Sequence, residues 1–238
     1  MQILYNDVAV NGTLSSFNLD ALTSIDNLID PRLSRSSRFT YFDGIIITLT
    51  FDLPQTIDAV GVGGTDLTDA ATITVNGVTA TQTSRNGNFF MPLAAEVTDT
   101  DFTITLLDTG TTNGAVINIG RLMAGTLYQA PGINDNVTLD YIVETDRQFS
   151  ASRQVYGQSL VNYQSIFVQL PVIEQTDKPD MMAFQDAVMD FKPFFLNFDE
   201  PCFDEGPFYV ILGGSNEFGY QLNGAHFWTL GLTFEEVY

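Results

Sequence analysis

Short runs of β-branched and aromatic residues, each closed by a turn signal, recur through the first 130 residues and constrain the fold more than any other feature. Residues 45–51 (IIITLTF) and 57–62 are two such runs, and Leu53-Pro54 between them is expected to end the first. Residues 101–107 alternate cleanly, so their apolar side chains share one face of a strand. This pattern predicts a β-rich fold.

One hairpin is signalled by sequence alone. Asn76-Gly77 separates residues 71–75 from residues 78–83, and this dipeptide favours the tight turn that joins antiparallel strands. Further strands are predicted at 3–10 and 89–93, and residues 115–128 are predicted to form a strand pair or one bent strand. Strands at a spacing of about 8–12 residues are typical of a β-sandwich. We therefore predict a sandwich over residues 1–130.

Residues 133–238 are predicted to form a smaller β-rich domain, which begins after Ala130-Pro131-Gly132. One helix is expected near 178–190, because Asp177 suits the N-cap and Pro179 suits the first turn. Three apolar residues then follow at helical spacing, namely Met181, Phe184 and Val188. The predicted fold class is thus mainly β, a sandwich followed by a β-rich domain with one α-helix.

The composition suits assembly better than binding to a polyanion. Hydrophobic residues make up 45% of the chain and charged residues 16%, against about 25% charged in an ordinary soluble protein. The net charge of −20 argues against a nucleic-acid partner and against an anionic membrane surface. No signal peptide and no apolar stretch of about 18 residues is evident, so we expect synthesis in a cytoplasm and no membrane insertion.

The first half resembles the galactose-binding-like, or discoidin-type, jelly roll. The matching pieces are the loop Asn27-Leu28-Ile29-Asp30, the step Ile57-Asp58-Ala59-Val60, and a closing strand with Ile119-Gly120-Arg121, which is similar to that of phage versions. The second half resembles the C-terminal part of phage tail-associated proteins, in its order of strand, Ser/Arg stretch, strand, short helix and aromatic strand. The resemblance implies an N-terminal jelly-roll β-sandwich in a structural virion protein.

That resemblance also implies a location and partners. The chain would be associated with the tail, tail tip or collar of a phage particle, and it would contact other copies of itself and other virion proteins. An alternative function is a glycan-binding adhesin module that contacts the host surface. The virion would then be the final location of the protein.

A structural Ca²⁺ is implied by the resemblance, because many discoidin-type domains hold one near the early loop. Asp26, Asn27 and Asp30 occupy the corresponding loop here. Calcium needs six to eight oxygen ligands, and the family's Gly-Asp continuation is replaced by Pro31-Arg32. The alternative is that Asp26 and Asn27 only form Asx turns. We expect no other cofactor.

A cluster of aromatic and basic residues precedes the first long strand. Arg38, Phe39, Tyr41 and Phe42 are candidates for binding a sugar, since aromatic rings and polar groups together hold glycans. The same residue types are enriched at subunit interfaces. Arg32 and Arg35 are interface candidates for the same reason, because they would dock on an acidic neighbouring copy. We favour the interface interpretation.

Catalysis is not predicted. The single histidine, His226, has no evident partners for a Ser–His–Asp arrangement. An acidic cluster includes Asp199, Glu200, Asp204 and Glu205, but local clusters are expected by chance among 29 acids. Cys202 is the only cysteine, so it forms no intrachain disulfide, and no phosphate-binding glycine motif is present. We therefore expect a non-enzymatic protein.

Overall fold

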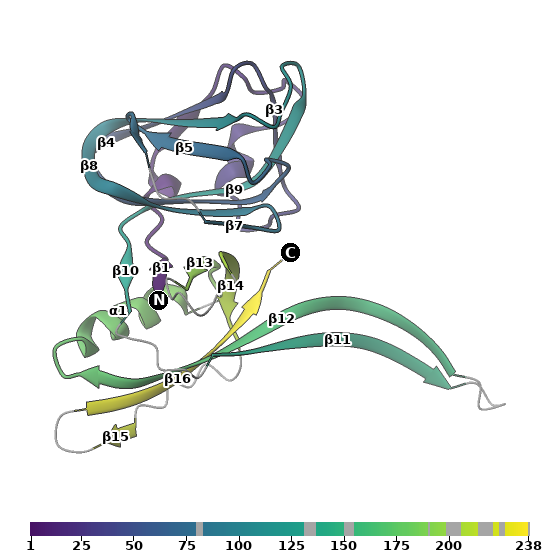
Figure 1. Cartoon of the computed structure of the whole chain (residues 1–238), viewed down its shortest axis with the longest axis vertical. Coiled ribbons are helices and arrows are strands. Elements are labelled where there is room, and N and C mark those ends of the chain that lie inside the picture. The colour runs from purple at the N-terminus through teal and green to yellow at the C-terminus, as the bar shows by residue number, and fades with distance from the viewer. Residues whose placement is uncertain are drawn as a thin grey trace.

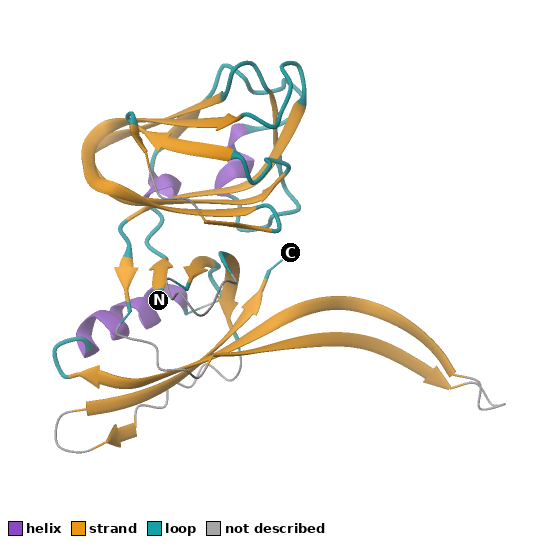
Figure 2. Cartoon of the chain, viewed as in Figure 1, coloured by secondary structure: helices purple, strands orange, loops and turns teal. Residues whose placement is uncertain are grey.

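The computed structural model of the chain describes residues 1–79, 83–130, 137–149, 155–189, 191–198, 206–213, 221–223 and 227–237. The described strands form two antiparallel β-sheets, and an α-helix packs on the sheet that contains most of the C-terminal half (Figure 1, Figure 2). The predicted fold class, mainly β with a sandwich and a β-rich unit that carries one helix, is confirmed for these residues. Among the described residues no helix has the length and apolarity needed to cross a membrane.

Two long strands build the first unit by passing through both of its layers. In one layer Ile45 to Thr50 of β4 (Ile45–Thr65) pair with part of β8 (Asn88–Asp108), and in the other Ala59 to Val62 of β4 pair with an earlier part of β8. Shorter strands complete the layers: β2 (Thr13–Ser15), β3 (Ser37–Thr40), β5 (Ala71–Val75), β6 (Val78–Thr79), β7 (Thr83–Arg85) and β9 (Val116–Gly125).

Leu53-Pro54 does not end the strand as predicted. The residues lie inside β4, where the pairing with β8 shifts register between Thr50 and Gln55. Proline cannot donate a ladder hydrogen bond, so it is tolerated at such an irregularity. The two predicted strands are thus one strand, bent from one layer of the sandwich into the other.

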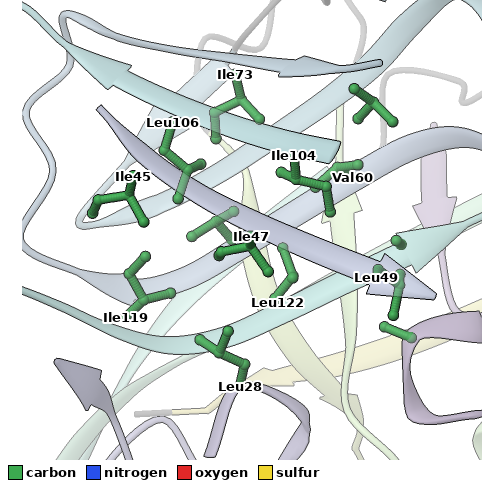
Figure 3. Close-up of a cluster of buried hydrophobic side chains, with 14 of the residues drawn as sticks. Leu28, Ile45, Ile47, Leu49, Val60, Ile73, Ile104, Leu106, Ile119 and Leu122 are labelled. Carbon is green, nitrogen blue, oxygen red and sulfur yellow. The ribbon is translucent and has the colours of Figure 1, made fainter. Parts of the chain in front are cut away.

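Alternating apolar residues fill the space between the layers. Phe102, Ile104 and Leu106 are fully buried, as the alternation of residues 101–107 predicted. Figure 3 shows neighbouring members of this core, contributed by β4, β5, β8 and β9. The predicted hairpin is also confirmed, since Asn76 and Gly77 have φ angles of 48° and 80° and join β5 to β6.

The second unit is a sheet in the order β10-β1-β13-β14-β16-β12-β11, with β15 beside β16. Its strands are β1 (Gln2–Leu4), β10 (Tyr128–Gln129), β11 (Val137–Phe149), β12 (Val155–Glu174), β13 (Phe194–Asn197), β14 (Phe208–Leu212), β15 (Gln221–Asn223) and β16 (Phe227–Glu236). Residues 2–4 and 128–129 therefore belong to this sheet, although the sequence placed them with the sandwich.

The chain between β1 and β2 also differs from the prediction. A strand was expected over residues 3–10, but β1 ends at Leu4 and a 3₁₀-helix, η1 (Val8–Asn11), follows. The carboxylate of Asp7 accepts a hydrogen bond from the backbone N–H of Ala9 and so caps that helix. Local capping by a short acidic side chain outweighs the strand propensity of the valines here. A second 3₁₀-helix, η2 (Ile25–Ile29), lies in the early loop.

The α-helix α1 (Lys178–Val188) lies where the sequence predicted it. Met181, Phe184 and Val188 are buried, as their spacing predicted. The Phe184 ring packs edge-on against Phe194 of β13, with centroids 5.4 Å apart. Asp177 occupies the N-cap position, but its side chain makes no capping hydrogen bond. The helix is therefore held mainly by its apolar face.

A small buried cluster joins the two units. It contains Leu4, Ala59, Phe90, Met123, Phe195 and Tyr209. Gly61 allows the close approach, because a Cβ there would lie 2.3 Å from the Phe195 ring. The Tyr209 hydroxyl donates a 3.0 Å hydrogen bond to the backbone carbonyl of Pro31. The sandwich and the second sheet therefore meet at a packed and hydrogen-bonded junction.

Candidate functional site

The aromatic cluster predicted to bind a glycan or a subunit is split by the strand geometry. Phe39, in β3, is fully buried and Tyr41 is 3% exposed, whereas Phe42 is 58% exposed. Side chains alternate along a strand, so Ser37 and Phe39 face the core while Arg38 faces outward. Phe39 and Tyr41 are therefore core residues, and their assignment as binding residues is corrected. Arg38 and Phe42 stay candidates.

Tyr41 has a structural role that its sequence context did not reveal. Its hydroxyl donates to the backbone carbonyl of Asp108 over 2.8 Å and accepts from the backbone N–H of Asp108 over 2.9 Å. Both backbone groups of Asp108 are thus satisfied by one buried hydroxyl. The ring fixes the end of β8 from inside the core.

Loops at the Phe42 end of the sandwich are tied together. The Asn18 amide donates to the carbonyl of Thr40 over 3.1 Å, and its oxygen accepts from the backbone N–H of Ile46. Asp43 and Asn113 exchange two 2.8 Å hydrogen bonds. This scaffold presents two exposed rings, Phe42 and Phe17, the latter 75% exposed and missed by the sequence reasoning. An aromatic residue inside the polar stretch of residues 15–20 was its only signal.

The loop predicted to hold Ca²⁺ is organised by other contacts. The Asp30 carboxylate accepts from Nε of Arg32 over 2.8 Å and from Nη2 of Arg32 over 2.7 Å, and Nη1 of Arg35 lies 3.3 Å away. The Asn27 amide donates to the carbonyl of Ser36, and Asp26 accepts from the Ser24 hydroxyl. Within the described ranges, no group of three His, Cys, Asp or Glu side chains could hold a metal.

The electrostatics of that loop follow from its arginines. The hydrogen bonds from Arg32, together with the charges of Arg32 and Arg35, hold the pKa of Asp30 well below its usual range. The carboxylate is therefore ionised but already paired with two cations. The two arginine side chains are 58% and 57% exposed, so they stay candidates for a subunit interface.

The residues weighed for catalysis lie outside the described residues. These are Asp199, Glu200, Cys202, Asp204, Glu205 and His226. A pocket of about 110 Å³ is lined by Tyr128, Gln129, Asp177 and Asp180 beside α1. Pockets for drug-sized ligands span about 300–1,000 Å³, so this one suits at most a very small ligand.

A two-stranded ribbon extends from the second sheet. β11 pairs with β12 from Val137↔Val168 to Phe149↔Val155, but β16 pairs with β12 only over Ser165 to Glu174. Residues 143–149 of β11 and 155–162 of β12, here called the arm, thus lie beyond the rest of the sheet. Figure 1 shows the ribbon curving away from the body. No pairing of the arm with any other described strand occurs.

Tyr141 marks the point where the body stops covering the ribbon. It pairs with Gln164, and directly opposite residues share a face of the sheet. Gln164 is 2% exposed and accepts a 2.7 Å hydrogen bond from Nη2 of Arg85 in the sandwich, whereas Tyr141 is 74% exposed. The sequence reasoning missed Tyr141, because the alternation of residues 137–142 does not show where the support ends.

No family model matches the chain, and no curated protein matches it. The crystal structure of SpGH29 is similar with a TM-score of 0.36 and 18% sequence identity. The match covers 51% of this chain and 28% of the SpGH29 chain. CpGH89CBM32-4 produced by Clostridium perfringens is similar with a TM-score of 0.37 and 15% identity, over 51% of this chain and 100% of that chain. Likeness at this level carries no argument about function.

Proposed function

We propose that this protein is a structural subunit of a larger particle, a phage virion, in which it joins neighbouring subunits near the tail, tail tip or collar. The observation that carries the assembly role is the arm. A two-stranded ribbon alone is marginally stable in water, and a long open edge invites pairing with another chain. A chain with such an element needs a neighbour. The virion setting rests on the resemblance of both halves to phage proteins.

The charge content supports an assembly role. Only 16% of the residues are charged, which leaves large neutral areas for contact with other subunits. Exposed apolar side chains on both units add to these areas, among them Phe17, Leu22, Leu53 and Tyr141. The net charge of −20 keeps free subunits apart until they meet their specific neighbours.

Mass spectrometry of particles purified from infected cells tests this function. The chain is expected at a fixed copy number relative to the other particle proteins after a salt wash. A variant without residues 145–160, joined by Asn-Gly, should be absent from particles although it is made and folded. Recovery of the intact chain only in the particle-free supernatant would end the proposal.

Glycan binding is the second candidate, and the rings of Phe17 and Phe42 on the tied loops favour it. Exposed rings on a rigid scaffold can stack on sugars. Binding of the chain to host surface glycans in an array, with a loss of at least tenfold in Phe42→Ser, would support it. Leu53→Ser is the matched control, because Leu53 is 71% exposed. Equal signals from both variants would remove the Phe42 site.

A further inference from the structure

Among the described strands, β11 has a partner along one edge only. β11 pairs only with β12 among the described strands, so the backbone groups on its other side have no strand partner there. Thirteen residues of β-strand reach about 43 Å at 3.3 Å per residue. Natural proteins shorten, bend or cover edges of this length to prevent uncontrolled pairing. An edge left open is suited to a specific partner.

The charge distribution indicates what kind of partner can approach. Residues 143–162 contain Glu144, Asp146, Arg147 and Arg153, and so have no net charge. The whole net charge of −20 therefore belongs to the rest of the chain. Two copies that meet through their bodies bring two strongly negative surfaces together, whereas two copies that meet through their arms do not.

We infer that the partner of this edge is the β11 edge of a second copy of the same chain. This inference rests on the proposed function, which it deepens by naming the neighbour. Two identical edges related by a two-fold axis run antiparallel and can exchange backbone hydrogen bonds on equal terms. The two ribbons then form one four-stranded sheet, in the order β12-β11-β11-β12.

This pairing removes the weakness of the isolated arm. A ribbon of two strands is marginal in water, while three or more strands can form a stable sheet. Each copy uses the same edge, so one contact pairs the backbone groups of both β11 strands. No free β11 edge then remains, and association through this surface ends with a dimer. Tyr141 lies on β11 at the base of the arm, on the same face as Gln164. The second ribbon would bury part of its exposed side chain.

Light scattering after size-exclusion chromatography tests the inference on the full-length chain. The intact chain should convert from monomer to dimer as its concentration rises, and the variant without residues 145–160 should stay monomeric. The dimer should depend only weakly on salt concentration, because the arms hold the two acidic bodies apart. Tyr141→Ser should weaken the dimer at least fivefold, while the control Leu53→Ser should not change it.

Hydrogen exchange on the unmodified chain gives a second readout that does not depend on a variant folding. Amides of residues 143–149 should become protected as concentration rises, and amides of β4 should not change. A monomer at every concentration would overturn the inference, and so would a dimer that persists without the arm. Arm protection that needs another particle protein would also overturn it. Incorporation into particles would in those cases still support the proposed function.

Discussion

Nη1 of Arg85 in the sandwich lies 3.5 Å from Oε1 of Glu236 in the last strand of the second sheet. The two side chains are 15% and 2% exposed, so the pair is largely removed from water. Arg85 also lies over the Phe208 ring, 4.2 Å from its centroid, and donates to Gln164. One guanidinium group thus connects the sandwich to β12, β14 and β16, which fixes the direction in which the arm leaves the body.

Removing that guanidinium group should loosen the junction. Arg85→Ala removes the largely buried ion pair with Glu236 and the hydrogen bond to Gln164, and breaking a buried ion pair costs about 3 kcal/mol. Urea unfolding measures the loss. Arg32→Ala is the matched control, because Arg32 forms its ion pair with Asp30 at the surface, where water screens the interaction, so the loss should be much smaller. Equal losses in the two variants would contradict a coupling role for Arg85.

The sequence predicted the elements of the sandwich better than their connections. Alternation in residues 101–107 and the Asn76-Gly77 turn are local signals, and both were confirmed because local geometry alone decides them. Pro54 was misinterpreted, because a proline that ends most strands can also sit where a strand bends between layers. The pairing of β1 with β13 joins residues nearly 200 positions apart, and no local pattern shows such a contact.

The candidate site was predicted less well, for a physical reason. Residue type indicated that Phe39, Tyr41 and Phe42 could bind a ligand, but exposure depends on the register of β3, which the sequence does not fix on its own. Asp30 was expected to be a metal ligand, but its carboxylate pairs with two arginines that follow it closely in the sequence, Arg32 and Arg35. The extent of the arm depends on where β16 stops pairing with β12, a tertiary feature.

The buried hydroxyl of Tyr41 should contribute measurably to stability. Tyr41→Phe removes the acceptor of the Asp108 backbone N–H, whereas the Asp108 carbonyl keeps its hydrogen bond from the Thr111 N–H; an unsatisfied buried group costs about 1–3 kcal/mol. Tyr141→Phe removes a hydroxyl from a side chain that is 74% exposed, so its free energy of unfolding should stay within about 0.5 kcal/mol of the parent. Chemical unfolding of both variants compares them directly. Similar values would show that Tyr41 does not hold β8.

The contact between Gly61 and Phe195 should be sensitive to a single methyl group. A Cβ on residue 61 would lie 2.3 Å from Cδ2 of Phe195, so Gly61→Ala forces the two units apart and should cost about 1–3 kcal/mol. Phe195→Leu in the same chain makes room and should recover part of the loss. A double-mutant cycle by thermal unfolding measures this coupling. Simple additivity of the two changes would refute the direct contact.

Calcium should have no effect on the stability of the sandwich. The Asp30 carboxylate is already paired with Arg32 and Arg35, so a cation would have to displace both of them. Thermal unfolding with millimolar Ca²⁺ and with a chelator should therefore give the same Tm. A Tm that rises with Ca²⁺ in the parent but not in Asp30→Asn would restore the metal site that the sequence suggested.

The stability of the sandwich should fall in acid through Asp108. Burial raises the pKa of its carboxyl, but hydrogen bonds outweigh this and leave the pKa below its usual value of about 4. The donors are the Thr68 hydroxyl and backbone N–H at 2.6 and 2.9 Å, the Thr111 hydroxyl at 2.8 Å, and the Gly110 backbone N–H at 2.9 Å.

Since the folded state binds the Asp108 proton more weakly than the unfolded state, the stabilisation is complete above the unfolded pKa. It is lost as the pH falls from about 4 through the lower folded pKa. Asp108→Asn cannot titrate, so the difference in unfolding free energy between parent and variant should shrink over that pH window. Asp69→Asn, which removes one exposed negative charge from the same unit, is the control for the change in net charge. A constant difference between Asp108→Asn and the parent from pH 6 to pH 2 would mean that Asp108 is not the group responsible.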